Sequence, residues 1–302
     1  MSALILHHYA LSPFSEKMRR IFAFKGLAWH AVEQPLMAPK PDLTPLTGGY
    51  RRIPVLQIGA DIYCDTALIA RMVERRYPTP TCLPANMAGN IALLEDWADH
   101  RLFMQVVPPV LVELLPALPP EFLTDRAAMT TGFSRKAIEE GAPQALSQTR
   151  QSLDRLDLQL QASPYLLGEQ FTLADASVYH CIWFLKNSPG LFAEVLARRG
   201  LADWFRRIEQ VAGDQIQPLT SAEALAIAKA AQPEDVHAGC VPDRDLRAGR
   251  PTTITADDYG IETTTGELIQ LTTDSITVVR TDQQVGQVAV HYPRAGYRIS
   301  QT

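Results

Sequence analysis

The first 82 residues alternate short apolar strands with amphipathic helices, and this order restricts the folds that the chain can adopt. A glycine at the end of the first helix and a proline after the second mark where those helices stop. Helices packed on a small mixed sheet fit the order. The predicted elements are strand Ala3–Tyr9, helix Pro13–Lys25, strand Ala28–Glu33, hairpin strands Ile53–Ile58 and Ile62–Cys64, and a helix from Asp65 that stops at Pro78.

The rest of the chain falls into two regions of different composition. After a linker rich in proline, the stretch from Ile91 to about Ala231 shows no convincing strand and predicts an all-helical domain, with helices broken at Pro108–Pro109. Within it, Thr172 and Asp175 have the spacing of a capping box. From about Val236 the chain is rich in threonine, valine and isoleucine, which predicts a small all-β module. The expected domains are 1–82, 88–231 and 236–302.

Composition excludes several classes of protein. The 302 residues carry a formal net charge of −5, which argues against a general nucleic-acid binder. No apolar run approaches the length of a membrane span, and the N-terminus lacks the basic lead-in of a signal peptide. The four cysteines are far apart, without metal-type or redox-type spacing. We therefore expect a cytoplasmic protein in a reducing compartment, with no metal and no membrane or nucleic-acid partner.

The turn into the first helix reads Ser12-Pro13-Phe14-Ser15. This is the layout of a Cys-x-x-Cys redox site with an oxygen in place of each sulfur. Proline is favoured at the first position of a helix, so Ser12 is the expected N-cap. A helix N-terminus also stabilises negative charge. Ser12 therefore has two interpretations: it only caps the helix, or it donates a hydrogen bond to a thiolate that a bound cosubstrate supplies.

Residues elsewhere in the first 82 positions favour the second interpretation of Ser12. Pro54 stands at the head of a strand, where thioredoxin-type sheets place a cis proline that turns a backbone edge toward the site. Asp65 and Thr66 open another helix. Arg51 and Arg52 could balance an anionic ligand. Together these features describe a pocket for a small acidic peptide that carries a thiol.

Taken in order, these segments resemble the glutathione S-transferase family, in its serine- or cysteine-type, bacterial-like form. The resemblance covers about residues 3 to 230, and its quoted stretches are "SPFSEKMRRIFAFKG", "RRIPVLQIGADIYCDTALIARMVERRYP" and "LLGEQFTLADASVYHCIW". It implies a thioredoxin-like α/β N-terminal domain and an all-α C-terminal domain. It implies nothing about the β module.

The resemblance also implies the residues that bind glutathione. Pro54 matches the cis proline of the family, and Ile53 matches the residue whose backbone pairs with the cysteinyl unit. Asp65 and Thr66 match the Glu-Ser pair that holds the γ-glutamyl end. Arg52 matches a frequent basic position near the glycyl end.

Ser12 falls at the catalytic position of the serine and cysteine classes, and Tyr9 is the runner-up donor, with packing of a strand-end tyrosine as its alternative. In the family, the first helix after the linker lines the pocket for the second substrate. The spacing of the residues on this helix fits a pocket wall and a stripe of core residues equally well. The expected pocket residues are Phe14, Trp97, Arg101 and Met104.

The resemblance thus implies a homodimeric enzyme of detoxification. It uses glutathione as cosubstrate, and the thiolate of glutathione attacks a small apolar electrophile. A specialised lyase or isomerase is a variant of this hypothesis. One alternative is a non-catalytic glutathione-binding or interaction protein. Another is a glutathione-dependent reductase or peroxidase, for which Cys64 is the cysteine to test, although burial of its thiol is the simpler expectation.

Overall fold

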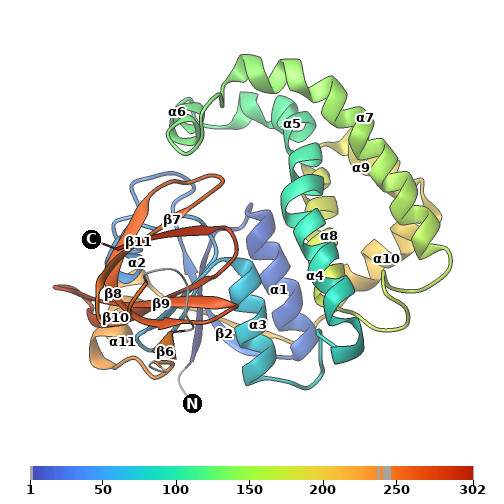
Figure 1. Cartoon of the computed structure of the whole chain (residues 1–302). Helices are drawn as coiled ribbons and strands as arrows, with labels where there is room; N and C mark the ends of the chain where they lie inside the picture. Colours follow the sequence, from blue (N-terminus) through green and yellow to red (C-terminus); the bar gives the residue numbers. More distant parts are fainter. Residues whose placement is uncertain (1–2, 237–238, 241–245, 302) are drawn as a thin grey trace.

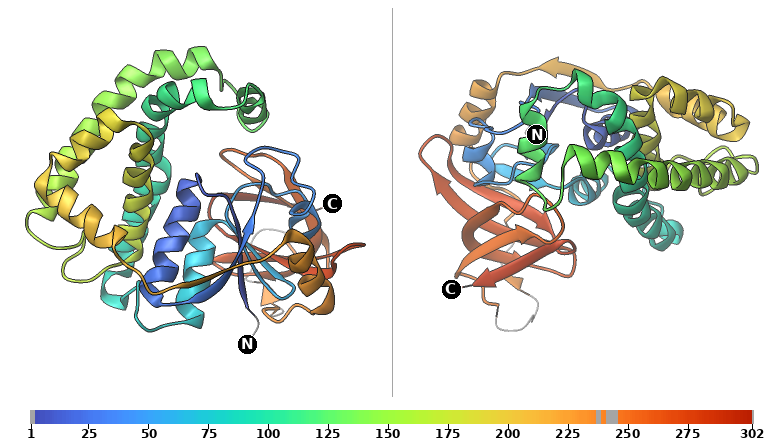
Figure 2. Two further views of the ribbon diagram at one scale, coloured as in Figure 1. Left: turned by 180° about the vertical axis from the view of Figure 1, so that it is seen from behind. Right: turned by 90° about the horizontal axis from the view of Figure 1, so that it is seen from above.

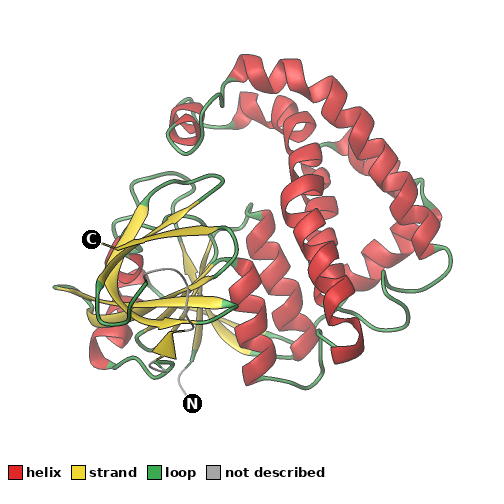
Figure 3. Cartoon of the chain, viewed as in Figure 1, coloured by secondary structure: helices red, strands yellow, loops and turns green. Residues whose placement is uncertain are grey.

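The computed structural model describes residues 3–236, 239–240 and 246–301. An arc of helices stands beside a strongly twisted sheet (Figure 1), and the two kinds of structure are clearly separated in Figure 3. The expected ranges 1–82 and 236–302 include a few residues that lie outside the described part.

The first third of the chain folds as its sequence predicts. Helix α1 begins after Ser12 and ends at Gly26, whose left-handed φ of 63° is a conformation that glycine adopts without strain. Strand β1 pairs in parallel with β2 and antiparallel with β3, which in turn pairs antiparallel with β4. The elements are β1 Leu4–His8, α1 Pro13–Lys25, β2 Ala28–Glu33, α2 Thr44–Thr47, β3 Val55–Ile58, β4 Asp61–Cys64 and α3 Thr66–Arg76.

The helical domain follows, and one prediction about it is wrong. Helix α5 continues through Pro108 and Pro109 instead of breaking. Proline at position 109 leaves the carbonyl of Gln105 without its helical donor, and the Thr149 hydroxyl donates to that carbonyl at 2.9 Å. The helices are α4 Ala88–Asp96, a π-helical turn Trp97–Leu102, α5 Phe103–Leu114, α6 Glu121–Ala127, α7 Arg135–Leu160, α8 Leu173–Phe184, α9 Pro189–Leu196 and α10 Arg199–Glu209.

The predicted capping box at the start of α8 is confirmed. Asp175 accepts hydrogen bonds from the backbone N–H and the hydroxyl of Thr172, both at 2.9 Å. It also accepts from Leu166 N and from the indole N–H of Trp204. This buried carboxylate therefore fixes α8, α10 and the loop before α8 to one another.

The expectation of no strand between Ile91 and Ala231 is also wrong. Strand β5 (Gln215–Pro218) pairs in parallel with β2 at the edge of the sheet, and α11 (Ser221–Ala230) follows it. Strand β5 has only four residues, all exposed, and includes a proline, so neither its length nor a buried face marks it in the sequence.

The C-terminal β module continues the same sheet. Strand β10 pairs in parallel with β4, and the strand order is β11-β7-β8-β9-β10-β4-β3-β1-β2-β5, with β6 beside β8. Seen from above, these C-terminal strands and the helical domain lie on different sides of the first strands (Figure 2, right). The module's strands are β6 Gly239–Cys240, β7 Pro251–Ala256, β8 Thr263–Leu271, β9 Ser275–Asp282, β10 Gly286–Pro293 and β11 Tyr297–Gln301.

Each face of the first sheet has its own core. Leu56 and Tyr63 belong to the cluster formed with α1, α3 and the helical domain. Their neighbours Val55, Ile62 and Cys64 belong to a second cluster, formed with the C-terminal strands. Because successive side chains of a strand point to opposite faces, the module covers the face that α1 and α3 leave open.

Candidate functional site

The segments predicted to form the site lie at one end of the sheet. His7 of β1 is opposite Val55 of β3, and Val55 is opposite Cys64 of β4. The residues after β1, before β3 and after β4 are therefore neighbours in space. The structure thus brings together the surroundings of Ser12, the Ile53–Pro54 peptide and the start of α3.

Ser12 is the N-cap of α1, as predicted. Its Oγ accepts a hydrogen bond of 3.1 Å from the backbone N–H of Ser15, and the residue is buried. Burial raises the pKa of the neighbouring Tyr9 phenol, and a hydrogen bond with Ser12 opposes part of that rise. Tyr9 is therefore a neutral hydrogen-bonding group beside Ser12 at neutral pH.

The second serine of the motif is also buried in the first turn of α1. Among the described residues, no group hydrogen-bonds to Ser15 Oγ. The same turn carries Ser12 Oγ, so two hydroxyls occupy the positive end of the helix dipole.

The Ile53–Pro54 peptide is cis. Within residues 3–236, 239–240 and 246–301, nothing hydrogen-bonds to the backbone N–H or C=O of Ile53. An unpaired backbone edge of this kind is suited to pairing with an extended peptide.

Asp65 caps α3 in a strained conformation. Its φ of 75° is unusual for a residue with a side chain. Oδ1 accepts from Ala67 N at 2.9 Å, and Oδ2 accepts from the Tyr297 hydroxyl at 3.1 Å. Thr66 follows as the first residue of the helix and is buried. Sequence reasoning placed Asp65 and Thr66 correctly at a helix N-terminus but missed Tyr297, which lies 232 residues further along the chain.

Arg52 also contacts the C-terminal module. Its guanidinium forms an ion pair with Asp258, and it lies over the Tyr259 ring at 4.7 Å from the ring centre. The neighbouring Arg51 pairs with Asp125 of α6 and with Glu262. Sequence reasoning found no role for Asp258 or Tyr259, because no local pattern marks either residue.

The predicted pocket residues divide into two groups. The Phe14 ring packs against Phe103 and His180, with ring centres 4.9 and 4.6 Å apart, and Trp97 packs half-buried on the helical core. Arg101 is exposed, and so is Met104, with 63% of its surface accessible. No ring contact or hydrogen bond links either of the last two residues to the cluster of Phe14, Phe103 and His180 within the described part of the chain.

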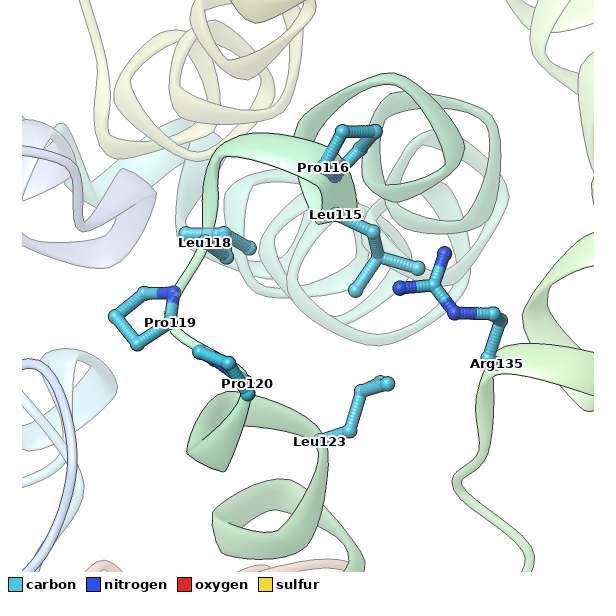
Figure 4. A pocket seen from close by; sticks show the side chains of 7 residues that line it. All are labelled: Leu115, Pro116, Leu118, Pro119, Pro120, Leu123 and Arg135. Atoms are coloured by element: carbon cyan, nitrogen blue, oxygen red, sulfur yellow. The ribbon is translucent and has the colours of Figure 1, made fainter.

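A hollow of about 380 Å³ lies elsewhere, where α5, α6 and α7 approach one another (Figure 4). None of the predicted site residues lines it. Its walls are mostly apolar, and Arg135 closes one side. The lining residues are Leu115, Pro116, Leu118, Pro119, Pro120, Leu123 and Arg135.

The cysteines whose side chains are described are buried, which raises the pKa of each thiol, that of Cys82 to about 12. The side chain of Cys240 lies outside the described part. The described residues hold no group of three His, Cys, Asp or Glu side chains that could bind a metal ion. Of the helices in the described part, none is both long and apolar enough to span a membrane.

Fold and site together define a two-part protein in which a thioredoxin-like sheet carries an all-helical domain. The pattern described as the glutathione S-transferase N-terminal domain matches residues 6–81, and that of the C-terminal domain matches residues 134–207. A solved GST-like protein from Pseudomonas syringae is 36% identical, with a TM-score of 0.83 over 100% of both chains. The chain belongs to the glutathione S-transferase family.

More distant structures share the fold. A glutathione S-transferase from Methylobacillus flagellatus, solved with GSH bound, is 21% identical (TM-score 0.53) and covers 70% of this chain and 96% of its own. A glutathione S-transferase from Rhodospirillum rubrum is 19% identical with a TM-score of 0.55, and the match covers 68% of this chain and 88% of that protein. The search of curated proteins found no match. About 30% of this chain thus has no counterpart in these two structures, whereas the Pseudomonas syringae protein matches over its full length.

Proposed function

We propose that this protein binds glutathione and promotes attack of its thiolate on an apolar electrophile. The observation that carries the proposal is the buried N-terminus of α1, capped by Ser12, at the same end of the sheet as the unpaired backbone of Ile53. A helix N-terminus and a hydroxyl stabilise an anion, so a thiol bound there would lose its proton more readily.

Each predicted residue has a role in this proposal. The peptide backbone of glutathione pairs with Ile53 beside the cis Pro54, and its γ-glutamyl end lies at Asp65 and Thr66. Arg52 lies beside the other end. Ser12 is the catalytic residue, because its hydroxyl donates to the thiolate. Catalysis then consists of lowering the thiol pKa and holding the sulfur against the electrophile.

The proposed second substrate is a small apolar molecule that binds near Phe14, Trp97, Arg101 and Met104. The contacts of Phe14 with Phe103 and His180 support an aromatic wall there. The exposed Arg101 and Met104 would lie at its rim. A homodimer with a role in detoxification in the cytoplasm completes the proposal. The homodimer and the role in detoxification rest on family resemblance, and the cytoplasmic location rests on the cysteine pattern and the N-terminal sequence.

The test compares two serines that each precede a proline at a helix start. Ser12→Ala should lower kcat/KM for conjugation of glutathione to a generic aromatic electrophile by about 10²-fold or more. Ser188→Ala is the matched control, because Ser188 precedes Pro189 at the start of α9 and its hydroxyl donates to Glu113 at 2.5 Å, away from the site. Equal losses in the two variants would contradict the role of Ser12.

Further measurements on the same protein address the alternative functions. Glutathione binding by calorimetry without turnover of any electrophile would favour a binding or interaction protein. Reductase or peroxidase activity would require a reactive thiol, and burial argues against Cys64 in that role because it keeps the thiol protonated. Reductase activity that disappears in Cys64→Ser would reverse this judgement.

A further inference from the structure

The loop between β7 and β8, residues 257–262, reaches the proposed glutathione site from the C-terminal module. It lies beneath α6 in Figure 1. Asp258 pairs with Arg52, and Tyr259 covers the Arg52 guanidinium. The sequence separation of Arg52 and Asp258 is 206 residues.

Besides the Asp258–Arg52 ion pair, two contacts hold the β7–β8 loop in position. Gly260 N donates to Met129 O at 2.8 Å, just beyond α6, and Glu262 pairs with Arg51 at 3.3 Å. Gly260 has a φ of 68°, and a Cβ there would lie 3.1 Å from Arg52 Nε. Only glycine fits this approach without strain. The loop is therefore fixed between Arg52 and the helical domain.

Carboxylates of the loop and of α6 pair with the arginines near the loop. Arg52 is paired with Asp258, Arg51 with Asp125 and Glu262, and Arg126 with Asp125. A ligand carboxylate beside Arg52 would have to displace Asp258 or lie next to a second negative charge. A ligand end without negative charge neither has to displace Asp258 nor is repelled by its carboxylate.

We propose that Asp258 is a specificity-determining residue, which makes the site select thiol peptides whose end beside Arg52 is neutral or cationic over those that end there in a carboxylate. This inference rests on the proposed function. The ligand class is a γ-glutamylcysteinyl peptide with an amidated carboxyl end, including amides that carry an amine. An amine at that end would lie near the Asp258 carboxylate, which favours a positive charge there.

Calorimetry with the full-length protein tests the inference, with glutathione and glutathione amide as the two probes. We expect the unaltered protein to bind the amide about tenfold more tightly than glutathione at low ionic strength. Asp258→Asn should strengthen glutathione binding by about tenfold and change amide binding by less than about threefold. Asp257→Asn is the control, since it removes the same charge from the next residue, whose side chain is exposed, and should leave the preference unchanged.

Three outcomes overturn the inference, and they can be told apart. If the unaltered protein and Asp258→Asn both bind glutathione at least as tightly as the amide, Asp258 does not set the specificity, while the proposed function stands. If neither protein binds either ligand, the proposed function itself fails, and the inference fails with it. An equal shift in Asp257→Asn and Asp258→Asn would show a general effect of charge and would likewise overturn the inference.

Discussion

His291 Nε2 of β10 lies 3.0 Å from Asp61 Oδ1 of β4, in a buried contact between residues 230 positions apart. The same imidazole is 3.0 Å from the Thr277 hydroxyl through Nδ1 and stacks on Tyr63 with ring centres 4.5 Å apart. Asp61 also accepts from Glu234 N at 2.8 Å, ahead of the module. These contacts fasten the C-terminal strands and the segment that leads to them onto β4.

Asp61→Asn should therefore destabilise the whole protein. The substitution keeps the shape of the side chain but replaces one acceptor oxygen with a donor, so buried N–H groups lose a partner. We expect the free energy of unfolding to fall by about 1–3 kcal/mol in chemical denaturation. Asp274→Asn, at the exposed turn between β8 and β9, should change it by less than about 0.5 kcal/mol. Equal stability of the two variants would show that this contact does not hold the module.

Several elements of the first and of the helical domain could be predicted because their signals are local. The proline after Ser12 and the glycine after Lys25 gave the observed ends of α1. The spacing of Thr172 and Asp175 identified a capping box that the structure confirms. Such signals depend on residues within one or two helical turns, so a single sequence contains them.

The rest of the site depends on contacts that no local pattern records. The consecutive residues Val288, Ala289 and Val290 of β10 are all buried, so both faces of this strand are covered, and its edges pair with β9 and β4. Pairing of β10 with β4 brings Tyr297 to Asp65 and Asp258 to Arg52. The sequence separations exceed 200 residues, so composition and periodicity could predict a β module but not where it docks.

Ser12→Ala should change the ionisation of bound glutathione. The variant removes the hydroxyl but keeps the N–H groups of α1, so we expect the thiol pKa in the complex to rise by about one unit or more. Thiolate absorbance of the complex, followed against pH, measures the shift. Loss of the cap should also cost about 1 kcal/mol of stability.

Tyr9→Phe distinguishes the runner-up donor. The Tyr9 phenol is held neutral by burial, and we expect its removal to leave the pKa of the bound thiol within about 0.3 units of that in the unaltered protein. A larger rise in Tyr9→Phe than in Ser12→Ala would transfer the role of donor to Tyr9.

Buried histidines should make stability depend on pH. Gln57 donates its amide to Ala224 O and Gly59 O, so its Oε1 accepts from His7 Nε2–H, and His7 Nδ1 then accepts from Gln34. This arrangement requires a neutral ring, and burial lowers the pKa of His7 to about 4.

The sign follows from linkage. As the pH falls below 6.5, the unfolded chain takes up a proton at His7 that the folded chain refuses until about pH 4. The free energy of unfolding should thus decrease by about 1.4 kcal/mol per pH unit from this group across that window. His7→Gln should make the slope shallower by about one proton, whereas replacing the exposed His100 should not. An unchanged slope in His7→Gln would contradict the assignment.

Lys17 should be the most costly single charge to remove. Its ammonium is fully buried between α1 and the helical domain, 2.7 Å from Asp99 and 3.5 Å from Glu95. Lys17 and a hydrogen bond from His180 together hold the pKa of Asp99 at about 2 despite burial, which by itself would raise it. Lys17→Met leaves that carboxylate without its cation, and we expect a loss of about 3–5 kcal/mol in the free energy of unfolding.

A double-mutant cycle separates pairing from packing. Lys17→Met combined with Asp99→Asn should recover about 1–3 kcal/mol relative to the sum of the single losses, because no unpaired charge then remains at that position. Lys186→Met is the exposed control: its partner Glu209 is also exposed, so the loss should stay below about 1 kcal/mol. Strict additivity of the two buried substitutions would mean that Lys17 stabilises α1 through its methylene chain and not through its charge.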